Sequence, residues 1–183
     1  MTAGRPLSGL DIRALVGEVA DALDPNGGSR HTVVLVGGSL LAWRGLRVST
    51  ADVDSVRPIT GELAAAVASV AHTHDLASDW LNANAAAFLP ATFNPDACEL
   101  LLDAPRLVVL GAPLRDVFLM KLYRADPNDV ADLIALWPHV GFANAGAVVD
   151  AFTAAYPHAP SDEHLDQLVI EIAYRAGDNI QPA

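Results

Sequence analysis

The chain has one cysteine, few basic residues and no long apolar run. Cys98 is the only cysteine among 183 residues, which excludes an internal disulfide and a cysteine-rich zinc site. There are 11 Lys and Arg residues against 22 Asp and Glu residues, giving a net charge of -11. This argues against a general nucleic-acid binder, because neutralising phosphates takes clustered basic side chains. No apolar run approaches the ~18 residues of a membrane span.

The N-terminal segment also lacks the apolar stretch of a secretory signal. Charged residues interrupt it at Asp11, Arg13, Glu18 and Asp21, and a signal sequence would keep this region apolar. We therefore expect a cytoplasmic protein with no membrane segment.

Hydrophobic periodicity predicts a mixture of strands and helices up to about residue 112 and helices alone after it. A first helix begins at Ser8-x-x-Asp11, a pattern typical of an N-terminal cap, and ends before Pro25. Short apolar runs predict strands at residues 32–36, 53–56, 98–102 and 107–110, the last two as a hairpin or as two sheet strands. Further helices are predicted at residues 39–45, 59–71, 113–123, 127–137, 143–156 and 161–176, with Pro138 as one of the breaks. Residues 72–95 give no clear prediction.

This order of elements predicts an α+β fold, with a small mixed sheet flanked by helices and a helical C-terminal part. Hydrophobic residues make up 52% of the sequence, which at this length is enough for one well-buried core. We interpret residues 1–183 as a single domain, with its core at about 30–112 and a helical portion at about 113–177.

The most informative segment is residues 33–56, VVLVGGSLLAWRGLRVSTADVDSV. An apolar run ends at Gly37 and Gly38, and Ser39 opens an amphipathic segment, an order typical of strand, tight turn and helix. The backbone N–H groups and the positive end of the helix dipole at such a turn suit a phosphate. Gly38 and Ser39 are therefore candidate triphosphate-binding residues. The alternative is a plain strand-to-helix turn that Ser39 caps.

Two aspartates follow this turn. On an extended segment the side chains of Asp52 and Asp54 would project to the same side, with their Cα atoms roughly 7 Å apart. Carboxylates at that spacing suit Mg²⁺, and two such ions lie ~3.5–4 Å apart in two-metal sites. A phosphate-binding turn beside a metal-binding carboxylate pair predicts phosphoryl or nucleotidyl transfer. A solvated surface pair is the alternative.

Gly-Ser, a short helix and Arg-x-Ser-Thr-x-Asp-x-Asp together resemble the signature of the nucleotidyltransferase superfamily, in the form of AbiE-type and MenT-type bacterial toxins. Trp80-Leu81-Asn82, Leu110-Gly111-Ala112-Pro113 and FLMKLYRADPNDVADLIAL at residues 118–136 match, in order, the pattern of those relatives. The resemblance covers about residues 33–137. It implies a nucleotidyltransferase-like fold and a Mg²⁺-dependent enzyme that moves a nucleoside monophosphate from an NTP to an acceptor hydroxyl. It further implies an RNA acceptor such as the tRNA 3′ end, and a toxin restrained by a cognate antitoxin.

The resemblance also assigns roles outside that segment. Lys121 would contact the nucleotide phosphates, with a solvated helix position as the alternative. Asp129 would be the catalytic acid that follows this lysine, with Asp132 as second choice and helix capping as the competing explanation. Glu99 could instead supply the third carboxylate from a later strand. Arg47 either reaches a phosphate or forms an ion pair within the chain.

The acidic charge leaves two other functions open. The acceptor could be a small molecule or a protein hydroxyl, or the chain could be a nucleotide-binding or protein-binding module without turnover. Trp80 is most simply a core residue, with a base-stacking surface as the alternative. An RNA acceptor would need a local basic patch, for which the candidates are Arg44, Arg47, Arg57, Lys121 and Arg124.

Overall fold

The structure, a computed structural model, describes residues 5–178. The chain divides into two compact units. The sheet unit comprises residues 1–87 and 96–112, and the helical unit comprises residues 88–95 and 113–183. The boundary between the units after residue 112 coincides with the boundary that the sequence analysis drew between the core and the helical portion. The interpretation of the chain as one domain stays a prediction.

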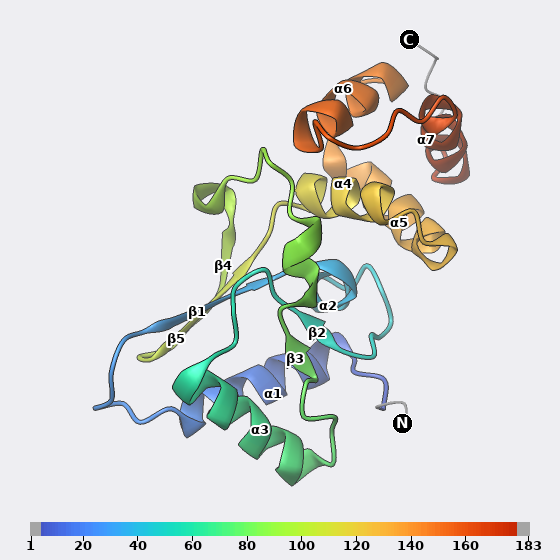
Figure 1. The fold of residues 1–183 in the computed structure, drawn as a ribbon. Coiled ribbons are helices and arrows are strands. Elements are labelled where there is room, and N and C mark those ends of the chain that lie inside the picture. Colours follow the sequence, from blue (N-terminus) through green and yellow to red (C-terminus); the bar gives the residue numbers. More distant parts are fainter. Residues whose placement is uncertain (1–4, 179–183) are drawn as a thin grey trace. The chain divides into compact units, whose positions relative to one another are not determined.

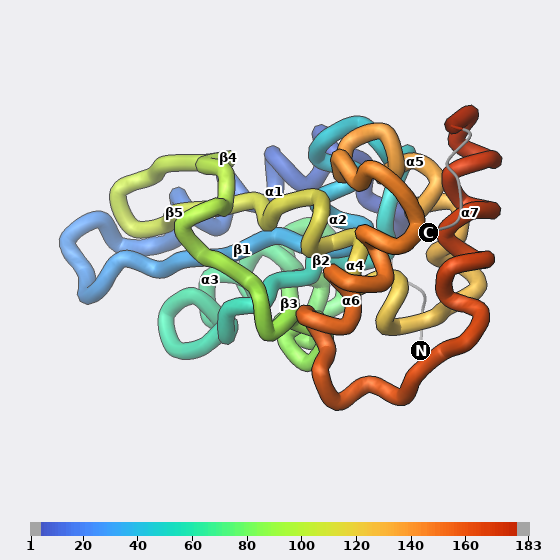
Figure 2. Tube along the Cα trace, turned by 90° about the horizontal axis from the view of Figure 1, so that it is seen from above, coloured from blue at the N-terminus to red at the C-terminus, as the bar shows by residue number. Residues whose placement is uncertain are grey.

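The sheet unit contains a three-stranded mixed sheet in the order β1-β5-β4 (Figure 2). β1 runs parallel to β5, and β4 pairs with β5 antiparallel as a hairpin. The predicted α+β fold with a small mixed sheet and a hairpin is therefore confirmed. The elements of this unit are α1 (Gly9–Ala22), β1 (His31–Leu35), α2 (Gly37–Trp43), β2 (Val53–Asp54), α3 (Gly61–His74), β3 (Leu81–Asn82), η2 (Pro95–Ala97), β4 (Glu99–Asp103) and β5 (Leu107–Gly111), with the 3-10 turn η1 (Asn84–Phe88) at its edge.

Helices α1 and α3 cover one face of this sheet (Figures 1 and 2). In β5 the residues Leu107, Val109 and Gly111 are buried and alternate with half-buried neighbours, the period of two expected when one face of a strand is covered. The predicted cap of α1 is confirmed, since the Ser8 hydroxyl accepts from the Asp11 N–H and the Asp11 carboxylate accepts from the Ser8 N–H. This capping box fixes where α1 begins.

A second, two-stranded ladder lies at the end of β1. β2 and β3 pair in parallel, with Asp54 opposite Asn82. The Val36 N–H donates to the Asp54 carbonyl at 3.1 Å, and Ser55 forms a bridge with Leu35, so β2 lies beside the point where β1 ends. The strand predicted at residues 53–56 is thus shorter than expected, and β3 lies in the segment that gave no prediction.

The helical unit contains α4 (Leu114–Arg124), the 3-10 turn η3 (Pro127–Asp129), α5 (Val130–Val140), α6 (Ala145–Ala155) and α7 (Leu165–Arg175). The predicted break at Pro138 is wrong, because α5 runs through it and ends at Gly141, which takes the left-handed conformation at φ 65°. Because Pro138 has no backbone N–H, the last turn of α5 lacks one hydrogen bond. The packing of Trp137, which is buried beside the proline, stabilises this turn up to its C-terminal glycine. Within residues 5–178 we find no helix with the length and apolar character needed to cross a membrane.

Residues 88–95 join the helical unit through two hydrogen bonds. The Tyr156 hydroxyl donates to the Phe88 carbonyl at 2.7 Å, and the Ala91 N–H donates to the Ala155 carbonyl at 2.8 Å. The Tyr156 ring stacks on Tyr123 with centroids 4.1 Å apart, and burial raises the pKa of the Tyr156 phenol. Residues 88–95 are therefore fixed by polar contacts to the end of α6, and the ring of Phe88 also contacts Tyr123 of α4, with centroids 6.4 Å apart.

Candidate functional site

The turn after β1 brings the backbone of Gly37 against a carboxylate of β2. Gly37 has φ +57°, a left-handed conformation that glycine adopts readily and that other residues rarely take. A Cβ placed on Gly37 would lie only 3.1 Å from Oδ2 of Asp54. The absence of a side chain at Gly37 therefore lets the carboxylate of Asp54 approach the start of α2.

Ser39 ties this helix start to β2. Its side chain is fully buried, its hydroxyl donates to the Val36 carbonyl at 2.8 Å, and it accepts from the Asp54 N–H at 3.3 Å. The capping position of α2 is Val36, which has no side-chain hydrogen bond to give. The alternative in which Ser39 caps the helix is therefore wrong. The triphosphate contact of Ser39 stays a prediction.

Gly38 is the point where the Arg-x-Ser-Thr segment packs on α2. A Cβ on Gly38 would meet Oγ1 of Thr50 at 2.8 Å and Nη1 of Arg47 at 3.2 Å. Arg47 Nε donates to the Ser49 carbonyl at 2.7 Å, and Thr50 exchanges two backbone hydrogen bonds with Leu7, at 2.7 and 2.9 Å. Packing thus explains the glycine of this motif, because only a residue without a side chain at position 38 leaves room for the side chains of Thr50 and Arg47.

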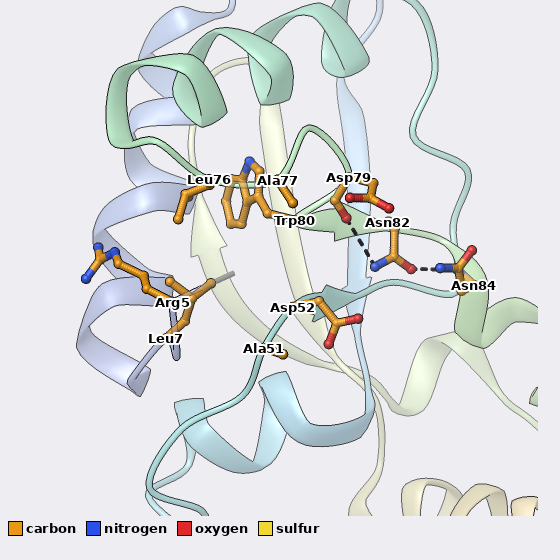
Figure 3. A pocket seen from close by; sticks show the side chains of 10 residues that line it. All are labelled: Arg5, Leu7, Ala51, Asp52, Leu76, Ala77, Asp79, Trp80, Asn82 and Asn84. Atoms are coloured by element: carbon orange, nitrogen blue, oxygen red, sulfur yellow. Dashed lines mark hydrogen bonds between the residues drawn. The ribbon is translucent and has the colours of Figure 1, made fainter. Parts of the chain in front are cut away.

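Asp52 lies in the bend before β2 and Asp54 lies in β2, on either side of Val53 in the chain. Both are half-buried, and Val53 between them is buried, which is the alternation that a strand imposes. Asp52 lines a pocket in the sheet unit together with Asp79, Trp80 and Asn82 (Figure 3). We call the set Gly37, Gly38, Ser39, Asp52 and Asp54 the β2 site.

The β2 site fits Mg²⁺ that is bound together with phosphates. Among residues 5–178 there is no group of three or more Asp, Glu, His or Cys side chains able to hold a metal ion. Mg²⁺ is, however, usually held by one or two carboxylates and completed by substrate phosphates and water. Asp52 and Asp54 supply that number. Glu99, the alternative third carboxylate, is on β4, where it pairs with Arg44.

The helical unit holds the other predicted residues in a second group, which we call the lysine cluster (Lys121, Arg124, Asp129 and Asp132). Nζ of Lys121 lies 2.7 Å from Oδ1 of Asp129 and 2.7 Å from Oδ2 of Asp132. Arg124 donates to both oxygens of Asp129 at 2.9 Å. The Lys121 side chain is 6% exposed and that of Asp129 is 2% exposed, so a solvated position for Lys121 is wrong.

A different aspartate, Asp126, caps the 3-10 turn η3 that leads into α5. The Asp126 carboxylate accepts from the Asn128 N–H at 2.9 Å, and this bond is the main cause that lowers the pKa of Asp126. Asp129 makes no side-chain cap bond. Its carboxylate serves Lys121 and Arg124 instead, which removes the capping explanation for Asp129.

The structure thus brings together Gly38 with Arg47, and Ser39 with Asp54, in one unit. It brings Lys121 together with Asp129 and Asp132 in the other. The sequence analysis includes Trp80-Leu81-Asn82 in the resemblance but assigns no role to Asn82. Trp80 is 2% exposed, and its indole N–H donates to a backbone carbonyl of α3 at 3.2 Å, so the core interpretation of Trp80 is confirmed.

A family model described as a nucleotidyltransferase of unknown function (DUF6036) matches residues 13–173. The chain belongs to this family. The matched range includes the β2 site and the lysine cluster. The nucleotidyltransferase description agrees with the superfamily that the sequence resembles and implies an NTP substrate, but it does not name AbiE-type or MenT-type toxins. Searches of curated proteins and of solved structures gave no match.

Proposed function

We propose that this member of the nucleotidyltransferase family is a Mg²⁺-dependent enzyme that moves a nucleoside monophosphate from an NTP to an acceptor hydroxyl. The observation that carries the proposal is the approach of Asp54 to Gly37 at the start of α2. The Asp54 carboxylate, which we propose binds the metal, thus lies beside the backbone turn that we propose for the triphosphate. Asp52, two residues before Asp54 in the chain, is the proposed second carboxylate.

Backbone N–H groups are the proposed phosphate contacts of the turn. The first residues of a helix have no intrahelical acceptor for their N–H groups, and Gly38 and Ser39 are in the first turn of α2. Because Ser39 is fully buried and its hydroxyl already serves Val36 and Asp54, we propose that Ser39 holds the turn to β2 and that the N–H of half-buried Gly37 makes the main contact with the triphosphate. Arg47 packs against Gly38 and is the proposed cationic contact from this unit.

In the proposed reaction the acceptor oxygen forms a bond to the α-phosphorus of the NTP. The bond from that phosphorus to the bridging oxygen breaks, and pyrophosphate leaves with the electron pair. The acceptor proton passes to a carboxylate or to water. Bound Mg²⁺, with two ions expected on Asp52 and Asp54, would stabilise the charge on the attacking and leaving oxygens. Lys121 and Asp129 are proposed as the phosphate-binding and acidic residues on the basis of the resemblance.

For the acceptor we propose RNA, with the tRNA 3′ end as the first candidate and a toxin role restrained by an antitoxin. A small-molecule or protein hydroxyl is the second candidate. The net charge of -11 favours the second candidate, because an acidic surface repels a phosphodiester chain and attracts a cation.

The test is transfer of label from each of four [α-³²P]NTPs to separate pools of total RNA, protein and small polyols or amines. Asp52→Asn and Asp54→Asn should each lower incorporation by about 100-fold or more, equivalent to ~2.7 kcal/mol of transition-state stabilisation. Asp79→Asn is the matched control, since Asp79 lines the same pocket but lies outside β2, and it should retain activity. Native incorporation by the Asp52→Asn/Asp54→Asn double variant would overturn the proposal. Mg²⁺-dependent nucleotide binding without product from any pool would favour the non-catalytic module.

A further inference from the structure

Asn82 lies next to Asp54 across the β2-β3 ladder. The two strands pair in parallel with Asp54 opposite Asn82 and Val53 opposite Leu81. Paired strands lie ~4.8 Å apart, and residues in register project to the same face. Val53 and Leu81 are both buried, so they occupy one face of the ladder. Asn82 therefore shares the other face with Asp54, and it lines one pocket with Asp52.

Figure 3 shows Asn82 and Asp52 lining the same pocket, with the amide oxygen of Asn82 turned to Asn84 and its amide nitrogen turned to Asp79. Two hydrogen bonds hold this amide. Its Nδ2 donates to the Asp79 carbonyl at 3.3 Å, and its Oδ1 accepts from the Asn84 N–H at 2.9 Å. These partners fix which end of the amide is oxygen. A carbonyl oxygen has two lone pairs, so Oδ1 of Asn82 keeps capacity for one further partner.

We infer that the Asn82 amide oxygen is a third oxygen donor to the divalent cation bound by Asp52 and Asp54. This inference rests on the proposed function and names a binding residue for the same site. Amide carbonyl oxygens belong to the hard donors that suit Mg²⁺ and Mn²⁺. A neutral donor also adds a ligand without adding a third negative charge. In a chain of net charge -11, this limits the repulsion of a triphosphate.

A purely structural role for Asn82 makes a different prediction. Its bond to the Asn84 N–H forms a side-chain turn at the start of η1, and such turns stabilise local backbone. Loss of that turn would lower stability but leave the cation affinity of the folded protein unchanged. Divalent cation affinity therefore separates the two roles without any need for turnover.

The experiment measures Mn²⁺ affinity from the electron paramagnetic resonance signal of free Mn²⁺, for Mn²⁺ alone and with α,β-methylene-ATP. Asn82→Ala should weaken Mn²⁺ binding by about 10-fold or more, in the range seen when groups around a metal are removed. Asn82→Asp keeps the oxygen that accepts from Asn84, so it should bind Mn²⁺ at least as tightly as the native protein. Asn84→Ala is the matched control: it keeps its backbone N–H and should leave Mn²⁺ affinity unchanged.

Several outcomes would overturn the inference. Native Mn²⁺ affinity in Asn82→Ala would do so, as would weaker binding by Asn82→Asp than by Asn82→Ala. The Asp52→Asn/Asp54→Asn double variant, measured in parallel, distinguishes this failure from that of the proposed function. If it loses Mn²⁺ while Asn82→Ala does not, only the role of Asn82 fails. If it binds Mn²⁺ normally, or if the native protein binds none, the metal-dependent function itself fails.

Discussion

Lys121→Met tests whether the lysine cluster stabilises the helical unit. Methionine keeps the length and the apolar stem of lysine but removes the ammonium group that lies 2.7 Å from both Asp129 and Asp132. The side chains of Lys121, Asp129 and Asp132 are 6%, 2% and 8% exposed, so water replaces the lost contacts poorly. Removing one partner of a buried ion pair costs about 3–5 kcal/mol.

The lower end of that range is expected, because Arg124 still donates to both oxygens of Asp129. A loss of about 3 kcal/mol, with an m value of about 2 kcal/mol/M, would move the urea midpoint by about 1.5 M. The assay is urea unfolding followed by circular dichroism at 222 nm. Arg175→Met is the control in the same unit, since Arg175 forms an exposed pair with Glu171 and should cost about 0–1 kcal/mol.

A double-mutant cycle with Asp132→Asn then measures the pair itself. Because each substitution removes a charge of opposite sign, the double variant should be less destabilised than the sum of the two single variants. A coupling of about 1–3 kcal/mol is expected for residues in direct contact. If Lys121→Met costs less than about 1 kcal/mol, or if the two substitutions are additive, the cluster does not stabilise this unit and the reasoning is refuted.

Two further substitutions test the sheet unit. Gly37→Ala should destabilise by about 1–2 kcal/mol from its left-handed backbone and should also weaken Mg²⁺-dependent nucleotide binding, since its Cβ would press on Asp54. Gly45→Ala is the control, because Gly45 has φ +74° but no atom near its Cβ, so this variant has the backbone strain without a steric contact. If both variants lose nucleotide binding equally, the contact between the Cβ at position 37 and Asp54 is not the cause. Ser8→Ala should cost about 1 kcal/mol in thermal unfolding at pH 7. Hydrogen bonds from Ser8 hold the pKa of Asp11 below its usual 3.8, so the part of this contribution that involves the Asp11 carboxylate is present above that pH and lost as the pH falls through the lowered pKa; a stability difference of unchanged size at pH 2 would disprove the link.

Local patterns predicted those parts of the fold whose cause is local. The Ser8-x-x-Asp11 cap specifies the start of α1 by contacts within one turn, and β5 shows the alternation of a half-covered strand. β2 and β3 have two residues each, too few to show any period. The two strands pair through the buried residues Val53 and Leu81. Because these residues are far apart in the sequence, no local pattern predicts their pairing.

The candidate site shows the same division. The segment from Gly38 to Asp54 could be recognised from the sequence because it is one local motif. The packing of Thr50 on Gly38 explains why a glycine is needed at the start of this motif. Asn82 could not be singled out, because its place beside Asp54 depends on the register of a parallel ladder. The partners of Lys121 were equally hidden, since they come from the helix that follows α4 and meet it only when the two helices pack.

The two sets of charged residues differ in how their charges are used, and this bears on how an acidic chain could bind a triphosphate. In the lysine cluster, two cations and two carboxylates contact one another, so little positive charge is left over there. Asp52 and Asp54 in the β2 site add negative charge, and the whole chain carries -11. Fixed side-chain charge therefore repels a nucleotide instead of attracting it.

A bound divalent cation would be the largest local charge and would reverse the sign of the field at the site. On the proposed function, the carboxylates thus serve to collect the ion that makes the nucleotide bind, and the nucleotide phosphates complete a coordination shell that two carboxylates and an amide oxygen leave unfilled.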